Sequence, residues 1–135
     1  PMQPEPVMWG QKELKPLGVG LGTNGLPGGC SGVDRFVRIA YLKSRISETE
    51  NLEIGISQFF HMLNNVAMPR GAVITDGNDD ITIYTSCMCQ QKGIYYYSTY
   101  NSNGINAVDM NKEDLNASEI KRFEYLDNLH ITYQN

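Results

Sequence analysis

The chain has 135 residues, of which 41% are hydrophobic and 19% are charged, an ordinary composition for one globular domain. Its net charge of −4 and the absence of lysine or arginine runs argue against a nucleic-acid partner. No apolar stretch approaches the roughly 20 residues that cross a bilayer, so no membrane contact is expected, and three cysteines are too few for a disulfide scaffold and indicate a reducing compartment.

Residues 1–33 are predicted to form a glycine- and proline-rich loop segment. The first 32 residues hold eight of the 13 glycines and five of the six prolines, with Trp9 as their only aromatic residue. Such a segment cannot build a core, and a structureless run of about 30 residues is uncommon in a compact domain. It is therefore either a functional loop or a segment that lies across a surface absent from this chain.

Gly20, Gly22 and Gly25 match the G-x-G-x-x-G spacing of dinucleotide-binding loops. That loop requires a buried strand before the glycines and a helix directly after them, whose amide groups bind the phosphates. Pro16 lies where the strand would have to run, and Pro27 interrupts the chain before a helix can start. The sequence therefore predicts no nucleotide here, and we expect no cofactor.

Two amphipathic helices are predicted within residues 34–68. The first starts at Asp34 and runs for about 12 residues. Ser47 and Glu50 have the spacing of a capping box, which marks the start of a second helix. A continuous apolar stripe follows, and Pro69 ends this helix. The stripe consists of Leu52, Ile56, Phe59, Phe60, Leu63, Val66 and Ala67.

Residues 71–135 are predicted to form antiparallel strands. Strand patterns cover residues 70–75, 79–87, 93–100, 105–110, 121–126 and 129–134, with a polar connection and one helical turn before the last two. Asn103-Gly104 is typical of a tight hairpin turn. Two helices followed by such strands indicate an α+β fold in which the helices cover one face of a sheet.

The residues alone offer few candidates for chemistry. Cys87 and Cys89 share one face of a predicted strand, but neither His61 nor His130 has ligand spacing to them, so two packed thiols are expected and no metal site. His61 is expected to be partly buried. Arg35 follows the glycine-rich loop at the start of a helix, where an anion would be favoured, although the pattern alone favours a solvated arginine.

Several motifs together resemble the carboxyl-terminal part of the choloylglycine hydrolase family, the conjugated bile acid hydrolases and penicillin V acylases. They are "GLGTNGLPGG", "DRFVRIAYLK", "SQFFHMLNNVAMPRG", "ITIYTSC" and "KGIYYYSTYNSNGINAVDMNKEDL", and they extend from about Leu17 to Tyr125. The resemblance implies an N-terminal nucleophile hydrolase, an αββα sandwich of two antiparallel sheets between helical layers. Residues 1–135 would be a partial copy of that single domain.

The resemblance also implies hydrolysis of a linear amide bond through a thioester on an amino-terminal cysteine. It places Arg35 beside that thiol, and Gly25, Leu26 and Pro27 along the substrate channel. "LPGG", in place of the "LPGD" associated with penicillin V acylases, favours glycine or taurine conjugates of bile acids as the small-molecule substrate.

Family chains are more than twice this length, and their nucleophile lies in the amino-terminal portion. The resemblance therefore implies that this chain alone is inactive, and that the intact protein is a cytoplasmic homotetramer. Three alternatives stay open: a penicillin V acylase, an acyl-homoserine lactone acylase, and a non-catalytic remnant of a truncated gene.

Overall fold

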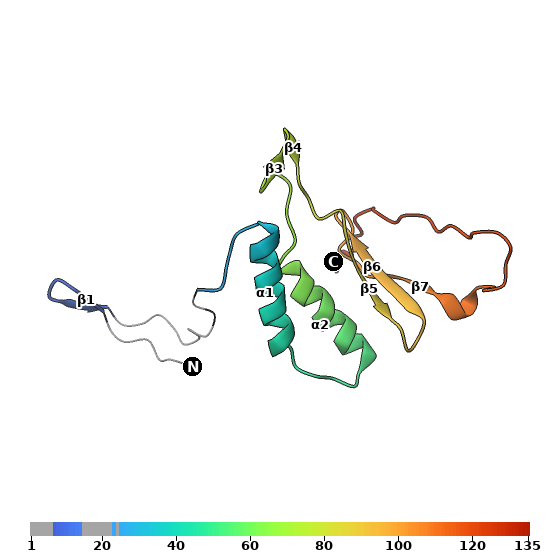
Figure 1. The fold of residues 1–135 in the computed structure, drawn as a ribbon, viewed down its shortest axis with the longest axis horizontal. Helices are drawn as coiled ribbons and strands as arrows, with labels where there is room; N and C mark the ends of the chain where they lie inside the picture. The colour runs from blue at the N-terminus through green and yellow to red at the C-terminus, as the bar shows by residue number, and fades with distance from the viewer. Residues whose placement is uncertain (1–6, 15–22, 24) are drawn as a thin grey trace.

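The computed structural model describes residues 7–14, 23 and 25–135, and Figure 1 shows its elements in chain order. They are β1 (Val7–Trp9), β2 (Lys12–Leu14), α1 (Gly32–Arg45), α2 (Leu52–Asn64), β3 (Ile74–Thr75), β4 (Asn78–Asp79), β5 (Tyr84–Cys89), β6 (Ile94–Thr99), β7 (Asn106–Asp109) and the short 3-10 helix η2 (Met110–Lys112). All strand pairs are antiparallel, as β1-β2, β3-β4 and β5-β6-β7. The predicted α+β class is confirmed.

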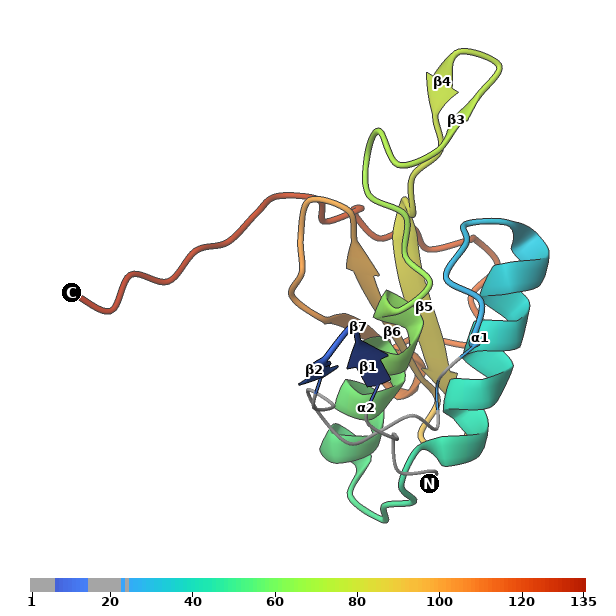
Figure 2. The same cartoon turned by 90° about the vertical axis from the view of Figure 1, so that its left-hand side faces the viewer.

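The three-stranded sheet carries both helices on one side. α2 packs against β5, and α1 packs against α2. Figure 1 shows the two helices next to each other on one side of the sheet, and Figure 2 views the molecule from that side. In the described residues, no helix is long and apolar enough to span a membrane. The predicted layering of two helices on an antiparallel sheet is confirmed.

The two faces of this sheet differ. Burial raises the pKa of Tyr96, and the nearby acidic groups of Cys89, Cys87, Asp109 and Glu53 raise it further. Because Glu53 belongs to α2, Tyr96 lies on the helix side of the sheet. Side chains alternate along a strand, and the opposite side carries Tyr84, Tyr95 and Tyr97, which we call the aromatic face. A cavity of about 420 Å³ lies there, closed in part by Phe123 and Tyr125.

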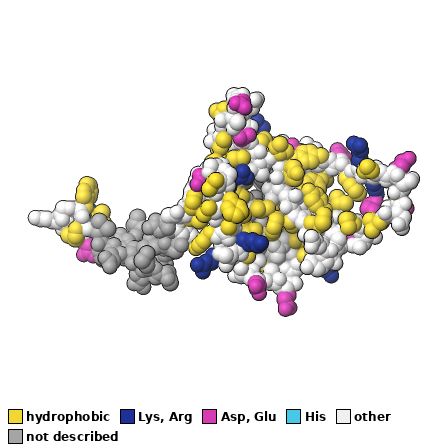
Figure 3. All heavy atoms as spheres, in the orientation of Figure 1, with side chains coloured by type: hydrophobic (Ala, Val, Ile, Leu, Met, Phe, Trp, Pro, Cys, Tyr) yellow, Lys and Arg dark blue, Asp and Glu magenta, His cyan; other side chains and the backbone are white. Residues whose placement is uncertain are grey.

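The described residues bury little apolar surface. Phe60 on α2, with 6% of its surface exposed, is their only buried hydrophobic residue, whereas Tyr84 and Phe36 keep 56% and 70% exposed. Figure 3 shows hydrophobic side chains gathered over the helices and the sheet. Exposed apolar patches of this kind mark surfaces that contact further polypeptide or a ligand.

Both helices begin at a different residue from the one predicted. α1 starts at Gly32, two residues before Asp34, because the Ser31 Oγ accepts a hydrogen bond from the Asp34 amide at 3.1 Å. The predicted capping box at Ser47 and Glu50 is wrong: Asn51 caps α2, and its Oδ1 accepts from the Ile54 amide at 3.0 Å. Asn51, and not Ser47, is the N-cap because it directly precedes Leu52, the first helical residue.

The turns also differ from the predictions. The predicted strand 70–75 shortens to β3, which pairs with the unpredicted β4 across Asp76 (φ 50°) and Gly77 (φ 79°), a dipeptide that tolerates the left-handed conformation. The predicted tight turn at Asn103-Gly104 is wrong, since neither residue has a positive φ. A wider loop forms instead, in which the Thr99 amide donates to the Ser102 carbonyl at 3.1 Å.

Strand predictions hold best in the middle of the chain. Residues 93–100 and 105–110 are confirmed as β6 and β7. The predicted strand 79–87 forms as β5, which starts five residues later and ends two residues later than predicted. The predicted strands 121–126 and 129–134 are wrong, because these residues join no ladder. The β1-β2 hairpin was not predicted; Gly10 with φ 63° turns it.

Candidate functional site

Two arginines on one face of α1 reach the end of α2. The Arg35 Nε donates to the Val66 carbonyl at 2.9 Å, and the Arg38 Nε donates to the Asn65 carbonyl at 2.9 Å. Residues three apart share a helix face, and the last carbonyls of a helix lack intrahelical partners and attract cations. α2 ends at Asn64, earlier than its apolar stripe predicts, which leaves these carbonyls for the arginines.

Arg35 lies half-buried at a cavity and not in bulk water. The cavity measures about 300 Å³ between the end of α2 and the start of β5 and is lined by Arg35, Leu63, Val66, Ala67, Thr82, Tyr84, Thr85 and Ser86. Within the described part of the chain, Nε is the only Arg35 nitrogen with a hydrogen-bond acceptor. Both terminal nitrogens are therefore available to an anionic or carbonyl group in this cavity.

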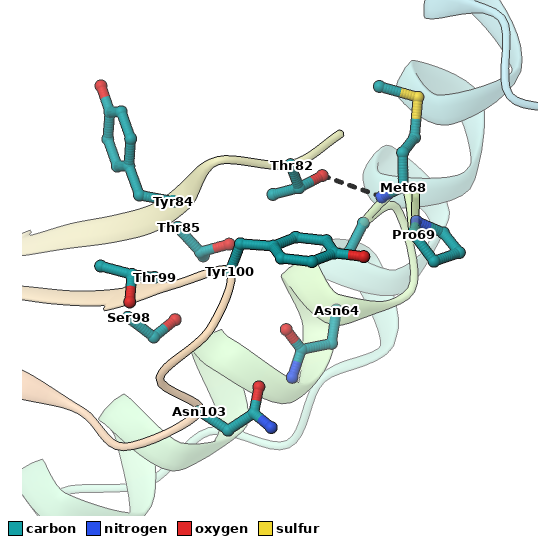
Figure 4. Close-up of a pocket in the computed structure, with 11 residues that line it drawn as sticks. Asn64, Met68, Pro69, Thr82, Tyr84, Thr85, Ser98, Thr99, Tyr100 and Asn103 are labelled. Carbon is teal, nitrogen blue, oxygen red and sulfur yellow. Dashed lines mark hydrogen bonds between the residues drawn. The ribbon is translucent and has the colours of Figure 1, made fainter. Parts of the chain in front are cut away.

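A second cavity, of about 310 Å³, adjoins the first and shares Ala67, Thr82, Tyr84 and Thr85 with it. Figure 4 shows that hydroxyl and amide side chains form much of its wall. The Thr82 Oγ1 accepts from the Met68 amide at 2.8 Å, and the Tyr100 hydroxyl accepts from the Arg70 amide at 2.8 Å. These bonds fasten the segment after α2 to residues that flank β5 and β6.

The glycine-rich loop is attached to α1 through Arg38. The Arg38 Nη1 donates to the Pro27 carbonyl at 2.7 Å and to the Gly29 carbonyl at 3.1 Å. Gly25 is exposed at φ 84°, in a turn that the Leu26 amide closes on the Thr23 carbonyl at 3.0 Å. Leu26 and Pro27 are half-buried. Gly20 and Gly22, the other glycines of the nucleotide-type spacing, lie outside the described residues.

Sequence reasoning missed Arg38. In the described residues, Arg35 has no hydrogen bond to Gly25, Leu26 or Pro27, and Arg38 makes the connection between that loop and the end of α2. The only signal in the sequence was its spacing of three residues from Arg35. Nothing in that spacing identifies loop carbonyls as the acceptors, because they are brought there by the fold.

The remaining candidates do not form a reactive centre in the described residues. Cys30 is exposed, and Cys87 and Cys89 are half-buried free thiols. Burial, with a smaller effect of Cys89, raises the pKa of Cys87, which disfavours its thiolate. The expectation that His61 is partly buried is wrong, since His61 is exposed.

Residues 1–123 match the sequence model of a protein family described as linear amide C–N hydrolases, choloylglycine hydrolase family. The chain belongs to the choloylglycine hydrolase family. The match starts before Leu17, so the proline-rich first residues share the family's sequence pattern as well.

Two curated members of the choloylglycine hydrolase family illustrate the similarity. A bile salt hydrolase/transferase of Clostridium perfringens is 48% identical over 127 residues, 93% of this chain and 39% of that protein. A bile salt hydrolase/transferase of Lactiplantibacillus plantarum is 42% identical over 102 residues, 75% of this chain and 32% of that protein. The chain thus spans well under half the length of the curated relatives it matches.

Solved structures show the same relation. A crystal structure of a variant conjugated bile acid hydrolase from Clostridium perfringens is 45% identical, with a TM-score of 0.82, over 98% of this chain and 41% of that one. Penicillin V acylase from Agrobacterium tumefaciens is 28% identical, with a TM-score of 0.60, over 67% of this chain and 29% of that one. The two helices and the sheet are therefore a partial copy of the N-terminal nucleophile hydrolase sandwich.

Proposed function

We propose that this chain is part of an enzyme that hydrolyses the amide bond of glycine- or taurine-conjugated bile salts. The observation that carries this proposal is the 48% identity, over 93% of this chain, to a protein named bile salt hydrolase/transferase. Because the chain covers 39% of that relative, the nucleophilic cysteine is proposed to come from residues outside these 135. This chain would be the carboxyl-terminal portion of the single domain.

Arg35 is proposed to act beside that cysteine. The α-amine of the amino-terminal cysteine would take the thiol proton, the thiolate would attack the amide carbon, and the amine would leave with a proton as the thioester forms. Water would then release the bile acid. A guanidinium next to sulfur lowers the cost of the thiolate. The half-buried position of Arg35 at a cavity, with no acceptor for its terminal nitrogens among the described residues, supports this role.

Gly25, Leu26 and Pro27 are proposed to border the substrate channel. Leu26 and Pro27 present apolar, half-buried surface, which suits a steroid skeleton, and the positive φ of Gly25 lets the chain turn there. We further propose that residues 1–33, 34–68 and 71–135 serve as loop, helical layer and sheet of one domain, and that the intact enzyme is a cytoplasmic homotetramer.

The direct test measures turnover by the intact protein that contains this chain. Release of glycine from glycocholate or taurine from taurocholate is expected, and Arg35→Gln should lower kcat by about 100-fold, as expected on losing a preorganised donor at the reacting centre. Arg45→Gln, on the last turn of the same helix, is the matched control and should leave kcat unchanged. The 135 residues alone should show no turnover, and glycine release by them would contradict the proposed division of the site.

Penicillin V acylase activity is the second candidate, favoured by the structural likeness to the Agrobacterium tumefaciens acylase. Side-by-side rates on glycocholate, penicillin V and an acyl-homoserine lactone distinguish the amide substrates. A non-catalytic remnant is distinguished by the gene itself. An in-frame extension upstream of Pro1 that begins Met-Cys favours the enzyme, and a stop codon there favours the remnant.

A further inference from the structure

We infer that Arg38 is a positioning residue that holds residues 26–29, the LPGG loop, in place at the substrate channel. This inference rests on the proposed function for its effect on catalysis. Its structural basis is one guanidinium that donates to three backbone carbonyls in two separate segments, those of Pro27, Gly29 and Asn65.

The geometry of Arg38 suits a bridge. Its Nη1 serves the loop at 2.7 and 3.1 Å while its Nε serves the end of α2 at 2.9 Å. Arginine alone combines a fixed planar fork with a permanent charge, and hydrogen bonds from a charged donor are the strong ones. Arg38 is half-buried, so water competes for these carbonyls only in part.

The loop also lies tightly against the start of α1. A Cβ placed on Gly29 would collide with the Asp34 carboxylate, which itself accepts from the Ser31 hydroxyl at 2.8 Å. Gly29 therefore lies directly against the Asp34 side chain, where a larger residue would displace that carboxylate. The hydrogen bonds from Arg38 to the Pro27 and Gly29 carbonyls hold this part of the loop next to α1.

Arg35 and Arg38 then have separate roles. Arg35 uses Nε to reach α2 and its terminal nitrogens have no acceptor among the described residues, whereas Arg38 uses both kinds of nitrogen on backbone carbonyls. Loss of Arg35 should affect the chemical step. Loss of Arg38 should release the loop and weaken the binding of substrate, with little effect on the chemical step.

The kinetic test compares Arg38→Gln, Arg38→Lys and the control Arg45→Gln in the intact protein. Arg38→Gln is expected to raise KM for glycocholate about tenfold with kcat within about twofold, since a tenfold change is the scale of one lost charge-assisted hydrogen bond. Lysine keeps the charge without the fork, so Arg38→Lys should give an intermediate KM. KM equal to that of Arg45→Gln, or a fall in kcat without a rise in KM, would overturn the inference.

Hydrogen exchange gives a readout that does not depend on bile salt turnover. Amides of residues 25–30 should exchange at least tenfold faster in Arg38→Lys and Arg38→Gln than in Arg45→Gln, while the amides of β6 keep their rates. If the unsubstituted protein hydrolyses no bile salt but this exchange pattern appears, the proposed function fails and the positioning of the loop stands. Unchanged exchange at residues 25–30 rejects the role of Arg38 whatever the activity.

Discussion

This chain covers the helix side of the three-stranded sheet more completely than the aromatic face. On the helix side, α2 packs on β5 and Phe60 is buried. On the aromatic face, Tyr84 and Met88 keep 56% and 53% of their surface exposed, and the cover is a carboxyl-terminal segment without a strand ladder. The helix side is covered by side-chain packing, whereas the aromatic face is only crossed by a segment that a few hydrogen bonds attach.

These bonds are specific. The Thr99 hydroxyl donates to the Leu126 carbonyl at 3.0 Å, and the Tyr125 hydroxyl donates to the Ile83 carbonyl at 3.1 Å. They fix a narrow strip and leave most of the aromatic face open. The chain thus supplies the contact between helices and sheet but not a full cover for the other face, and we propose that the second sheet of the intact sandwich covers the aromatic face.

The largest expected effect is on the helix side. Phe60→Ala in the intact protein should lower the free energy of unfolding by about 3–5 kcal/mol, because it removes a buried aromatic side chain and leaves a cavity. Urea denaturation followed by circular dichroism measures this. Phe59→Ala, at the half-buried neighbouring position, is the matched control and should cost clearly less.

Met88→Ala then tests the aromatic face in the same protein. If a second sheet covers this face, the substitution should cost about 2 kcal/mol or more, as for buried methionine. If the face stays as exposed as it is here, the cost should stay within about 0.5 kcal/mol. The smaller value would contradict the proposed second sheet.

Periodicity predicted the elements that depend on local pattern. The apolar stripe of α2 and the alternation of β6 are properties of consecutive residues, so the helix side of the molecule was largely predictable. The misses lie where a distant partner decides. The segment 121–134 has strand composition but joins no ladder, and Arg38 finds acceptors up to 27 residues away.

The site was predictable only in part for the same reason. Arg35 was identified by resemblance, and its half-buried position comes from Val66, a residue 31 positions further along the chain. The relation between the glycine-rich loop and the arginines depends on where α2 ends. α2 ends at Asn64 and not at the predicted residue 68, and the sequence pattern contains no sign of the difference.

A smaller effect is expected at the start of the helix that covers the sheet. Asn51→Ala should lower the free energy of unfolding by about 1 kcal/mol, because it removes the oxygen that accepts from the Ile54 amide. Ser47→Ala should change it by less than about 0.5 kcal/mol. Equal losses in urea denaturation of the two variants would restore the capping box that the sequence predicted.

The smallest effect concerns the segment that crosses the aromatic face. The nearby Thr99 side chain, followed by the backbone and side-chain amides of Asn101, holds the pKa of Asp127 below its usual 3.8. The Asn101 amides donate to its carboxylate at 3.1 and 2.6 Å. A carboxyl group with a lowered pKa in the folded state stabilises the protein above its unfolded pKa. That contribution is lost as pH falls through the lower folded value.

The free energy of unfolding should therefore fall more steeply below pH 4 in the unsubstituted protein than in Asp127→Asn, which has no carboxyl group to titrate. Urea denaturation at pH 7 and at pH 3 measures the difference. Asp76→Asn, at an exposed turn, is the matched control and should keep the unsubstituted pH dependence. If Asp127→Asn kept it too, the carboxylate would not hold this segment, and the bonds of the Thr99 and Tyr125 hydroxyls would be left to attach it.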